Sequence, residues 1–225
     1  MAELRDDAFL LRRVAYGDSS YIIHVLSRTH GRLSLMARGA RRAKSPFRAS
    51  LEPLYELHLG WRPGRTGMGT LSDADRGAPV VDAALSPEGL QLCAVAASLY
   101  QEGDPQGFEE LSNAFAVLTA RTPRAGTPGG MLAGVWSLLD AQGLLGPLDH
   151  CWQCGQACDD LCWHAAECRC EACGGGQSLS RGIRRAIPAL MQSAGVSLSS
   201  ADLTMWAGMI QDVLRRHGIR PLNMI

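Results

Sequence analysis

The sequence has 225 residues, enough for one large domain or two modest ones, each with a buried core. Apolar residues make up 46% and charged residues 20%, a composition typical of globular proteins, which excludes a wholly disordered chain. The net charge of zero hides an asymmetry. Residues 1–80 carry 13 Lys and Arg against 8 Asp and Glu, whereas residues 81–225 carry 9 against 14. A basic segment joined to an acidic segment suggests that a polyanion-binding module is attached to a second module with another function.

The chain shows neither a membrane span nor a secretory signal. No apolar run has the length of a span, and the first residues, which include Glu3, Arg5 and Asp6, lack an apolar signal segment. We therefore expect a cytoplasmic protein. Thiols stay reduced in that compartment, so the eight cysteines are expected to be metal ligands or core residues instead of disulfides.

The first third of the chain predicts a small closed β-barrel. The predicted strands cover residues 9–14, 21–26, 32–38, 55–61 and 67–72. In the third strand Leu33, Leu35 and Ala37 share one face, and the fourth alternates in the same way from Tyr55 to Trp61. Turn residues separate the strands at short spacing, with no helical period between most of them. Five short strands in such a segment are typical of a barrel.

From Ser86 onward the apolar period becomes that of helices. Three dipeptides combine a capping oxygen with a proline suited to the first helical turn: Ser86-Pro87, Asp104-Pro105 and Thr127-Pro128. They predict three successive helices, the third ending near Gly143. Two more helices are predicted, one over 183–191, which Pro188 should kink, and one from about Ser200 to Gly218.

Seven of the eight cysteines lie between residues 151 and 173. They include two Cys-x-x-Cys knuckles fifteen residues apart, formed by Cys151 with Cys154 and by Cys170 with Cys173. Each knuckle turns two thiolates toward one ion, and two knuckles joined by a short loop give a tetrahedral four-sulfur zinc site. Four protein ligands leave no position for water. The pattern therefore predicts one structural zinc ion per chain, in a zinc-finger loop at about 149–176.

Other potential ligands lie near the knuckles and could replace one of the four: Cys158, Cys162, Cys168, His150 and His164. Their spacing forms no second knuckle, so spare thiols and surface imidazoles are the favoured interpretation. Cys93, on the apolar face of a predicted helix, is expected in the core.

Motifs of several enzyme classes are absent from the sequence. A zinc deaminase needs His-x-Glu ahead of Pro-Cys-x-x-Cys, and a metalloprotease needs His-Glu-x-x-His. The triple glycine at 174–176 lacks the Lys-Ser/Thr of a phosphate-binding loop. We therefore expect a protein without catalytic activity.

Residues 28–48 carry seven basic residues and no acidic one. Such a concentration of like charge destabilises a fold unless a polyanion relieves the repulsion. Phe47 could add a stacking surface, so the segment predicts nucleic-acid binding, with a solvated loop as the alternative. The predicted contact residues are Arg32, Arg38, Arg41, Arg42, Lys44 and Arg48.

Several features occur together in this chain: 10–19 (LLRRVAYGDS), 30–33 (HGRL), 38–42 (RGARR), 51–54 (LEPL), a helix ending in 143–145 (GLL), and the paired knuckles. In combination they resemble the RecO family of bacterial recombination mediators over essentially the whole chain. The resemblance implies an α+β multidomain protein, with a five-stranded OB-fold barrel at 1–80. An α-helical domain at 81–225, interrupted by the zinc loop, would follow it.

The resemblance also implies a function in DNA repair and recombination, in the RecF pathway. A family member would bind single- and double-stranded DNA and anneal complementary strands. With RecR, it would load the RecA recombinase onto DNA coated by single-strand-binding protein. It would be cytoplasmic and nucleoid-associated.

Contact with single-strand-binding protein would involve the acidic, apolar C-terminal tail of that partner. Because the helical domain is acidic overall, only a local basic pocket could receive the tail. The candidates are Arg184, Arg185, Arg215 and Arg216, and solvated helix arginines are the alternative interpretation.

Two other functional classes remain open from the residues alone. One is a zinc-ribbon adaptor of transcription or translation that uses the barrel on RNA. The other is a purely structural scaffold without affinity for nucleic acid.

Overall fold

The computed structural model describes residues 2–65, 67–191 and 197–220, and it describes their side chains except those of 121–127. The chain divides into two compact units, Met1–Ala116 and Val117–Ile225. The N-terminal unit therefore contains more than the 80 residues of the predicted barrel domain, because one helix and the start of another belong to it. No helix in the described ranges is long and apolar enough to cross a membrane.

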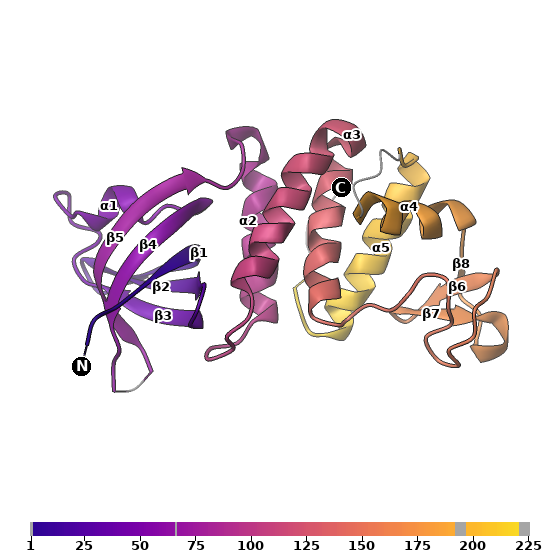
Figure 1. The fold of residues 1–225 in the computed structure, drawn as a ribbon, viewed down its shortest axis with the longest axis horizontal. Coiled ribbons are helices and arrows are strands. Elements are labelled where there is room, and N and C mark those ends of the chain that lie inside the picture. The colour runs from indigo at the N-terminus through magenta and orange to yellow at the C-terminus, as the bar shows by residue number, and fades with distance from the viewer. Residues whose placement is uncertain (1, 66, 192–196, 221–225) are drawn as a thin grey trace. The chain divides into compact units, whose positions relative to one another are not determined.

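The N-terminal unit contains a closed five-stranded barrel (Figure 1). Its strands are β1 (Leu4–Tyr16), β2 (Ser20–Ser27), β3 (Gly31–Ala37), β4 (Tyr55–Arg62) and β5 (Gly69–Pro79). The order around the barrel is β1-β2-β3-β5-β4, antiparallel throughout except for β3 and β5, and pairing of β1 with β4 closes it. A closed five-stranded barrel of this order is an OB fold, and the predicted fold is confirmed.

The barrel core consists of the residues that the alternating pattern assigned to it. Leu35 and Ala37 of β3 are buried, with Leu33 packed against them, and β4 contributes its apolar positions from Leu57 to Trp61. Strand β5 extends to Pro79, beyond the predicted 67–72, because its polar second half still pairs with β4. Periodicity does not detect such a half, since few of its side chains are apolar.

Helices cover one end of the barrel within the N-terminal unit. Phe9 of β1 pairs with Leu26 of β2, and both side chains point away from the barrel core, which their neighbours along the strands fill. Both are nevertheless buried. The ring of Phe9 stacks on that of Phe108 at 4.3 Å between centroids and meets Phe115 edge-on at 5.5 Å. Phe108 and Phe115 belong to α3 (Phe108–Ala141), so helix and barrel share one apolar contact.

Arg28 lies over the same aromatic contact, with its guanidinium carbon 4.1 Å from the Phe108 ring centroid. It forms ion pairs with Asp7 at 3.4 Å and Glu56 at 3.3 Å, and also with Glu109. Although Arg28 belongs to the basic segment of the sequence, its charge is balanced inside this unit.

Two short helices and one regular helix complete the N-terminal unit: α1 (Phe47–Ser50), η1 (Ala83–Leu85) and α2 (Ser86–Leu99). The predicted start at Ser86-Pro87 is confirmed, with proline in the first turn, but the predicted cap is wrong, because the Ser86 hydroxyl donates to the Ala83 carbonyl and accepts from no described helix amide. The two helices predicted after it are instead one element, α3, which continues through Thr127-Pro128. A proline adopts the same φ at a helix start and inside a helix, so the dipeptide does not distinguish the two positions.

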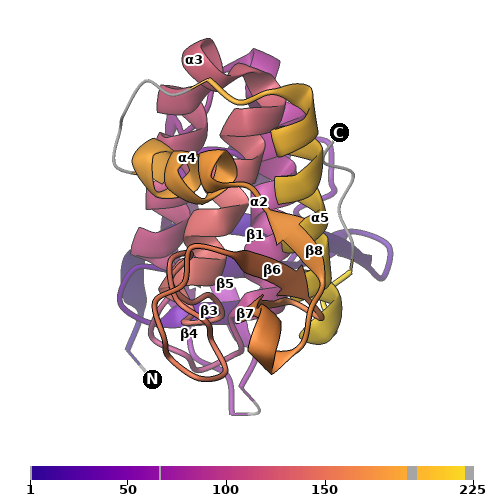
Figure 2. The same ribbon diagram turned by 90° about the vertical axis from the view of Figure 1, so that its right-hand side faces the viewer.

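The C-terminal unit contains the rest of α3, two further helices and a small sheet of order β7-β6-β8 (Figure 2). The helices are α4 (Arg181–Met191), which contains Pro188, and α5 (Ser200–Arg216). The strands are β6 (Leu161–His164), β7 (Glu167–Cys170) and β8 (Gln177–Leu179). Trp136 of α3 meets the fully buried Trp206 of α5 edge-on at 6.0 Å, which marks the helical core.

Two turn glycines of the barrel allow a matched test of its packing. Gly17 and Gly31 both have positive φ, +55° and +63°. A Cβ at Gly17 would meet nothing within 4 Å, whereas one at Gly31 would lie 1.5 Å from the carbonyl oxygen of Asp104. We expect Gly17→Ala to reduce the free energy of unfolding by about 1 kcal/mol, the cost of the left-handed backbone alone. Gly31→Ala should cost at least about 2 kcal/mol more, because backbone must move.

Denaturant unfolding followed by circular dichroism measures both values. Equal destabilisation by the two substitutions would contradict the close approach of Gly31 to the segment that follows α2.

Candidate metal centre and nucleic-acid interface

The four knuckle cysteines lie together in the C-terminal unit. Cys151 and Cys154 precede β6, Cys170 ends β7, and Cys173 ends the short helix η2 (Glu171–Cys173). Antiparallel pairing of β6 with β7 returns the chain, and the amide of Trp152 donates to the Cys168 carbonyl at 2.8 Å. Both knuckles are followed by glycines with positive φ, at 155 and 174, as a tight chain reversal requires.

The geometry of this cysteine cluster suits a tetrahedral ion. All four Sγ atoms lie within 4.8 Å of one another, and Sγ of Cys154 is 3.9 Å from Sγ of Cys170. Four sulfurs bound tetrahedrally at about 2.3 Å from an ion lie about 3.8 Å apart. The four cysteines can therefore bind a metal ion without rearrangement of the chain.

Hydrogen bonds to the sulfurs support the same assignment. Backbone amides of Cys154 and Cys170 donate to the sulfur of Cys151 and lower its pKa to about 6. Hydrogen bonding to Cys170 and Cys154 raises the pKa of Cys173 to about 12. Four sulfurs this close are all thiolate only when a cation lies among them, because like charges at this distance oppose each other's ionisation.

The other potential ligands do not join the cluster, which among the described residues consists of the four knuckle cysteines. Burial raises the pKa of Cys168 to about 11 and that of Cys93, in α2, to about 12. Burial and the nearby Cys170 also raise the pKa of Cys158. His150 Nδ1 forms a hydrogen bond with Oδ1 of Asp149 at 2.7 Å, and His164 is exposed at the end of β6.

Two tryptophans connect the loop that contains the four cysteines to α5 of the same unit. Trp152 meets Trp163 edge-on at 5.6 Å, and its Nε1 donates to the Pro147 carbonyl at 2.7 Å. Trp163 Nε1 donates in turn to Oδ2 of Asp212 in α5 at 2.9 Å. Trp152 lies inside the first knuckle and Trp163 lies between the two knuckles, but the knuckle pattern specifies only cysteines, so the sequence did not indicate this role.

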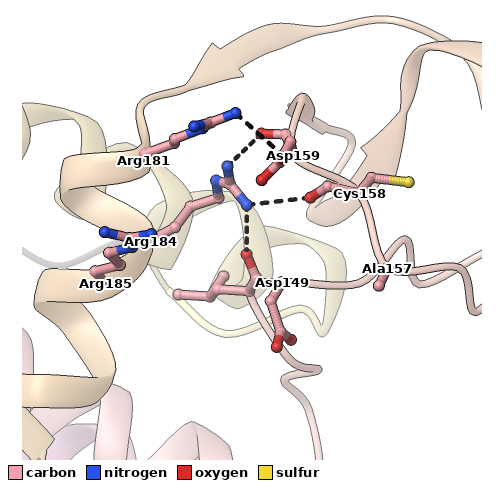
Figure 3. Close-up of a pocket in the computed structure, with 8 residues that line it drawn as sticks. Asp149, Ala157, Cys158, Asp159, Arg181, Arg184 and Arg185 are labelled. Carbon is pink, nitrogen blue, oxygen red and sulfur yellow. Dashed lines mark hydrogen bonds and ion pairs between the residues drawn. The ribbon is translucent and has the colours of Figure 1, made fainter.

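The predicted partner-binding arginines lie in two separate places. Arg184 and Arg185 line a pocket of about 380 Å³ together with Arg181 of the same helix (Figure 3). Arg215 and Arg216 line another hollow on α5 with Arg169. Arg181 was not predicted, although its spacing of three and four residues from the other two places all three on one side of a helix.

The two arginine groups differ in how far their charge is balanced. Arg215 pairs with Asp212 at 2.5 Å, and Arg216 pairs with Glu167 at 2.5 Å. In the α4 pocket, Arg181 pairs with Asp159 at 3.3 Å, and Arg184 donates to carbonyls of Leu148, Cys158 and Asp159 (Figure 3). Arg185 is exposed, and no carboxylate in the described ranges pairs with it.

The basic segment between β3 and β4 forms a folded loop in the N-terminal unit. Its buried residue Ala40 anchors it, and Arg41 is held by two contacts to the β1–β2 turn. The Arg41 amide donates to the Ser19 carbonyl at 2.8 Å, and its guanidinium donates to the Gly17 carbonyl at 2.8 Å.

Five predicted contact residues belong to this loop, are exposed and take part in no ion pair with a described carboxylate: Arg38, Arg41, Arg42, Lys44 and Arg48. We call them the basic loop. Their uncompensated charge leaves the loop electrostatically strained unless an anion is bound.

Two residues of the predicted interface lie elsewhere. Arg32 is half-buried, and its guanidinium donates to the carbonyls of Ala97 and Tyr100, both at 2.7 Å, at the end of α2. It stabilises the helix C-terminus, where carbonyls lack partners. Phe47 packs against the barrel core, so it does not form an exposed stacking surface.

Comparison with known proteins agrees with this geometry. Residues 1–77 match the family model described as Recombination protein O N terminal. The chain is 32% identical over 161 residues to the DNA repair protein RecO of Myxococcus xanthus, which covers 70% of this chain and 66% of that protein.

The chain belongs to the RecO family.

Other RecO proteins match over shorter stretches of the chain. The DNA repair protein RecO of Laribacter hongkongensis is 43% identical over 68 residues, 30% of this chain and 28% of that protein. That of Bifidobacterium animalis is 44% identical over 66 residues, 29% of this chain and 28% of that protein. The chain thus spans less than two thirds of the length of the RecO proteins that it matches.

The metal centre leads to a test by substitution. Purified protein should contain one metal ion per chain, and Cys151→Ser or Cys173→Ser should lose it and lower the melting temperature, because the ion ties two chain segments together. Cys162→Ser is the matched control and should retain the ion. Elemental analysis with differential scanning calorimetry gives both values. Full metal retention in both knuckle variants would show that other side chains bind the ion.

Proposed function

We propose that this chain is a non-enzymatic DNA-binding recombination mediator in DNA repair. The observation that carries the proposal is the basic loop, which is exposed and pairs with no described carboxylate, on an OB barrel of the RecO family. The mediator would bind single- and double-stranded DNA and promote annealing of complementary strands.

The chemistry of the basic loop suits a ligand of this kind. Arginine forks pair with phosphate oxygens in bidentate fashion, and phosphate contacts carry no sequence information. A protein that anneals strands of any sequence needs contacts of this type. Release of condensed counterions then supplies much of the binding free energy.

We infer that the metal is zinc and that its role is structural. Four thiolates in tetrahedral arrangement are the donor set that zinc favours, and they leave no coordination position for a reacting water. Cys151, Cys154, Cys170 and Cys173 would hold the ion, and its binding would contribute to folding of the loop.

Membership of the RecO family is the basis for proposing that the chain acts together with other repair proteins. With RecR, the mediator would help load RecA on DNA coated by single-strand-binding protein. For the acidic, apolar tail of that protein, we propose the α4 pocket as the better site, because no carboxylate among the described residues pairs with Arg185, whereas Arg215 is paired with Asp212. An apolar hollow lined by Leu144, Leu145 and Trp152 lies beside it and shares Asp149 with it.

The salt dependence of DNA binding tests the basic loop. Binding to single strands should weaken with a log–log slope of roughly −3 to −5 if about five phosphates are neutralised. Replacing Arg41, Arg42 and Lys44 by Ala should reduce the magnitude of that slope by about two and slow annealing. Fluorescence anisotropy across a salt series measures the slope.

A charge-matched control is the triple variant Arg181→Ala, Arg185→Ala and Arg215→Ala, which removes three positive charges from the other unit and should keep the slope. If the loop variant binds as tightly as wild type throughout the salt series, the loop is only a solvated surface. Parallel titrations with RNA of the same sequence test the alternative of an RNA-binding adaptor, which requires tighter binding to RNA at matched salt.

The tail-binding pocket has its own test. Arg185→Glu should weaken binding of a peptide with the acidic tail sequence by about tenfold, the effect of losing one charge-assisted hydrogen bond. Arg215→Glu makes the same change of charge at the other hollow and should leave the affinity within about twofold. Calorimetric titration measures both, and wild-type affinity in the Arg185 variant would exclude the α4 pocket.

A further inference from the structure

The outer face of the barrel carries an apolar row that the core does not use. Val14 of β1 pairs with Ile22 of β2, and Ile22 pairs with Met36 of β3. All three are half-buried, and they alternate with residues that point into the barrel, such as Ile23 and Leu35. The row therefore lies across three strands on the outside of the sheet.

An exposed aromatic residue extends this row at the end of β1. Tyr16 lies two residues after Val14, on the same face, opposite Ser20. Its side chain is 56% exposed, the most exposed large apolar side chain in the described ranges, where Leu90 is 45% and Met68 is 37% exposed. Burial of a tyrosine ring is favourable, so such exposure at a turn leaves a flat surface open to a ligand.

The basic loop borders the same end of the row. The Gly39 amide donates to Ser20 Oγ at 3.2 Å, which places Arg38 and Gly39 beside the residue opposite Tyr16. The Arg41 guanidinium binds the carbonyl of Gly17, the residue after Tyr16. At the other end of the row lies Arg12, which is exposed and stands opposite His24 in the register of β1 and β2. The β1–β2 turn itself contains one acidic residue, Asp18.

A ligand that fits this face must present flat apolar groups to the row and anionic groups to both ends. Single-stranded DNA has this chemistry, because its unpaired bases can stack on an aromatic ring while its phosphates reach arginines. A duplex hides its base faces in the helical stack and offers only phosphates to the basic loop.

We propose that Tyr16, with the Val14–Ile22–Met36 row, is a base-contacting site that selects single-stranded over double-stranded DNA. The proposal rests on the function proposed above and adds a second, uncharged component to it. The basic loop binds any DNA through phosphate, and the row adds affinity for strands whose bases are free.

The two components respond differently to salt, and this separates them experimentally. Tyr16→Ala should weaken binding of a fluorescent single-stranded oligonucleotide by about fivefold to a hundredfold, the effect of removing a stacking aromatic. The log–log salt slope should not change, because no phosphate contact is lost. Affinity for the duplex of the same sequence should stay within about twofold.

Conservative variants and a matched control complete the design. Tyr16→Phe and Tyr16→Trp retain a ring and should bind single strands within about twofold of wild type. The added tryptophan fluorescence of Tyr16→Trp should be quenched by single strands and not by duplex. Leu90→Ala removes another exposed apolar side chain, from α2, and should leave all affinities unchanged.

Two outcomes distinguish failure of this inference from failure of the proposed function. If Tyr16→Ala binds single strands as tightly as wild type while the basic-loop variant still changes the salt slope, the row is not a base-contacting site and the DNA-binding function stands. If wild-type protein binds neither form of DNA, the proposed function itself is overturned.

Discussion

In the N-terminal unit, the pairing of β1 determines what the barrel presents to solvent. The first half of this long strand pairs with β4 and the second half with β2, so one strand closes the barrel. Between Leu10 and Arg12 the register with β2 shifts by one residue. A bulge of this kind bends a strand and increases its twist, which allows a five-stranded sheet to close on itself. It also changes which side chains face outward. Phe9 lies outside before the shift, and without the extra residue Arg13 and Ala15 would follow it, instead of Val14 and Tyr16.

The same face of the barrel is therefore used in two ways. Where helices of the unit cover it, the outward side chains are Phe9 and Leu26, and an aromatic stack buries them. Past the bulge, the outward side chains are half-buried or exposed and lie next to arginines that pair with no carboxylate in the described part of the chain. Basic residues are divided in the same manner. Arg28 forms ion pairs and Arg32 donates to carbonyls at the end of α2, whereas the side chains of the basic loop pair with no described carboxylate.

The grouping of the four knuckle cysteines was predicted correctly from the sequence, whereas the surroundings of several single side chains were not. The cysteine quartet was predictable because two knuckles at a suitable spacing need only a short chain reversal to meet. Alternation identified the core faces of the third and fourth predicted strands, because that pattern depends only on neighbouring positions along the chain. The position of Arg32 at the end of α2 depends on a contact 65 residues away in the sequence, which no local pattern encodes. The burial of Phe47, the exposure of Tyr16 and the separation of the four partner arginines likewise result from packing.

The strands β6, β7 and β8 have only three or four residues each. A sheet of this size buries too little apolar surface to offset the entropy of ordering its chain, so its folding is expected to follow metal supply. The loop that contains the four cysteines also provides the carbonyls that hold Arg184 and one wall of the α4 pocket. Availability of the ion would then act on the α4 pocket, which we proposed as the partner-binding site, and leave the barrel unaffected. Under the functions proposed above, starvation for metal would separate DNA binding by the basic loop from partner binding at the α4 pocket.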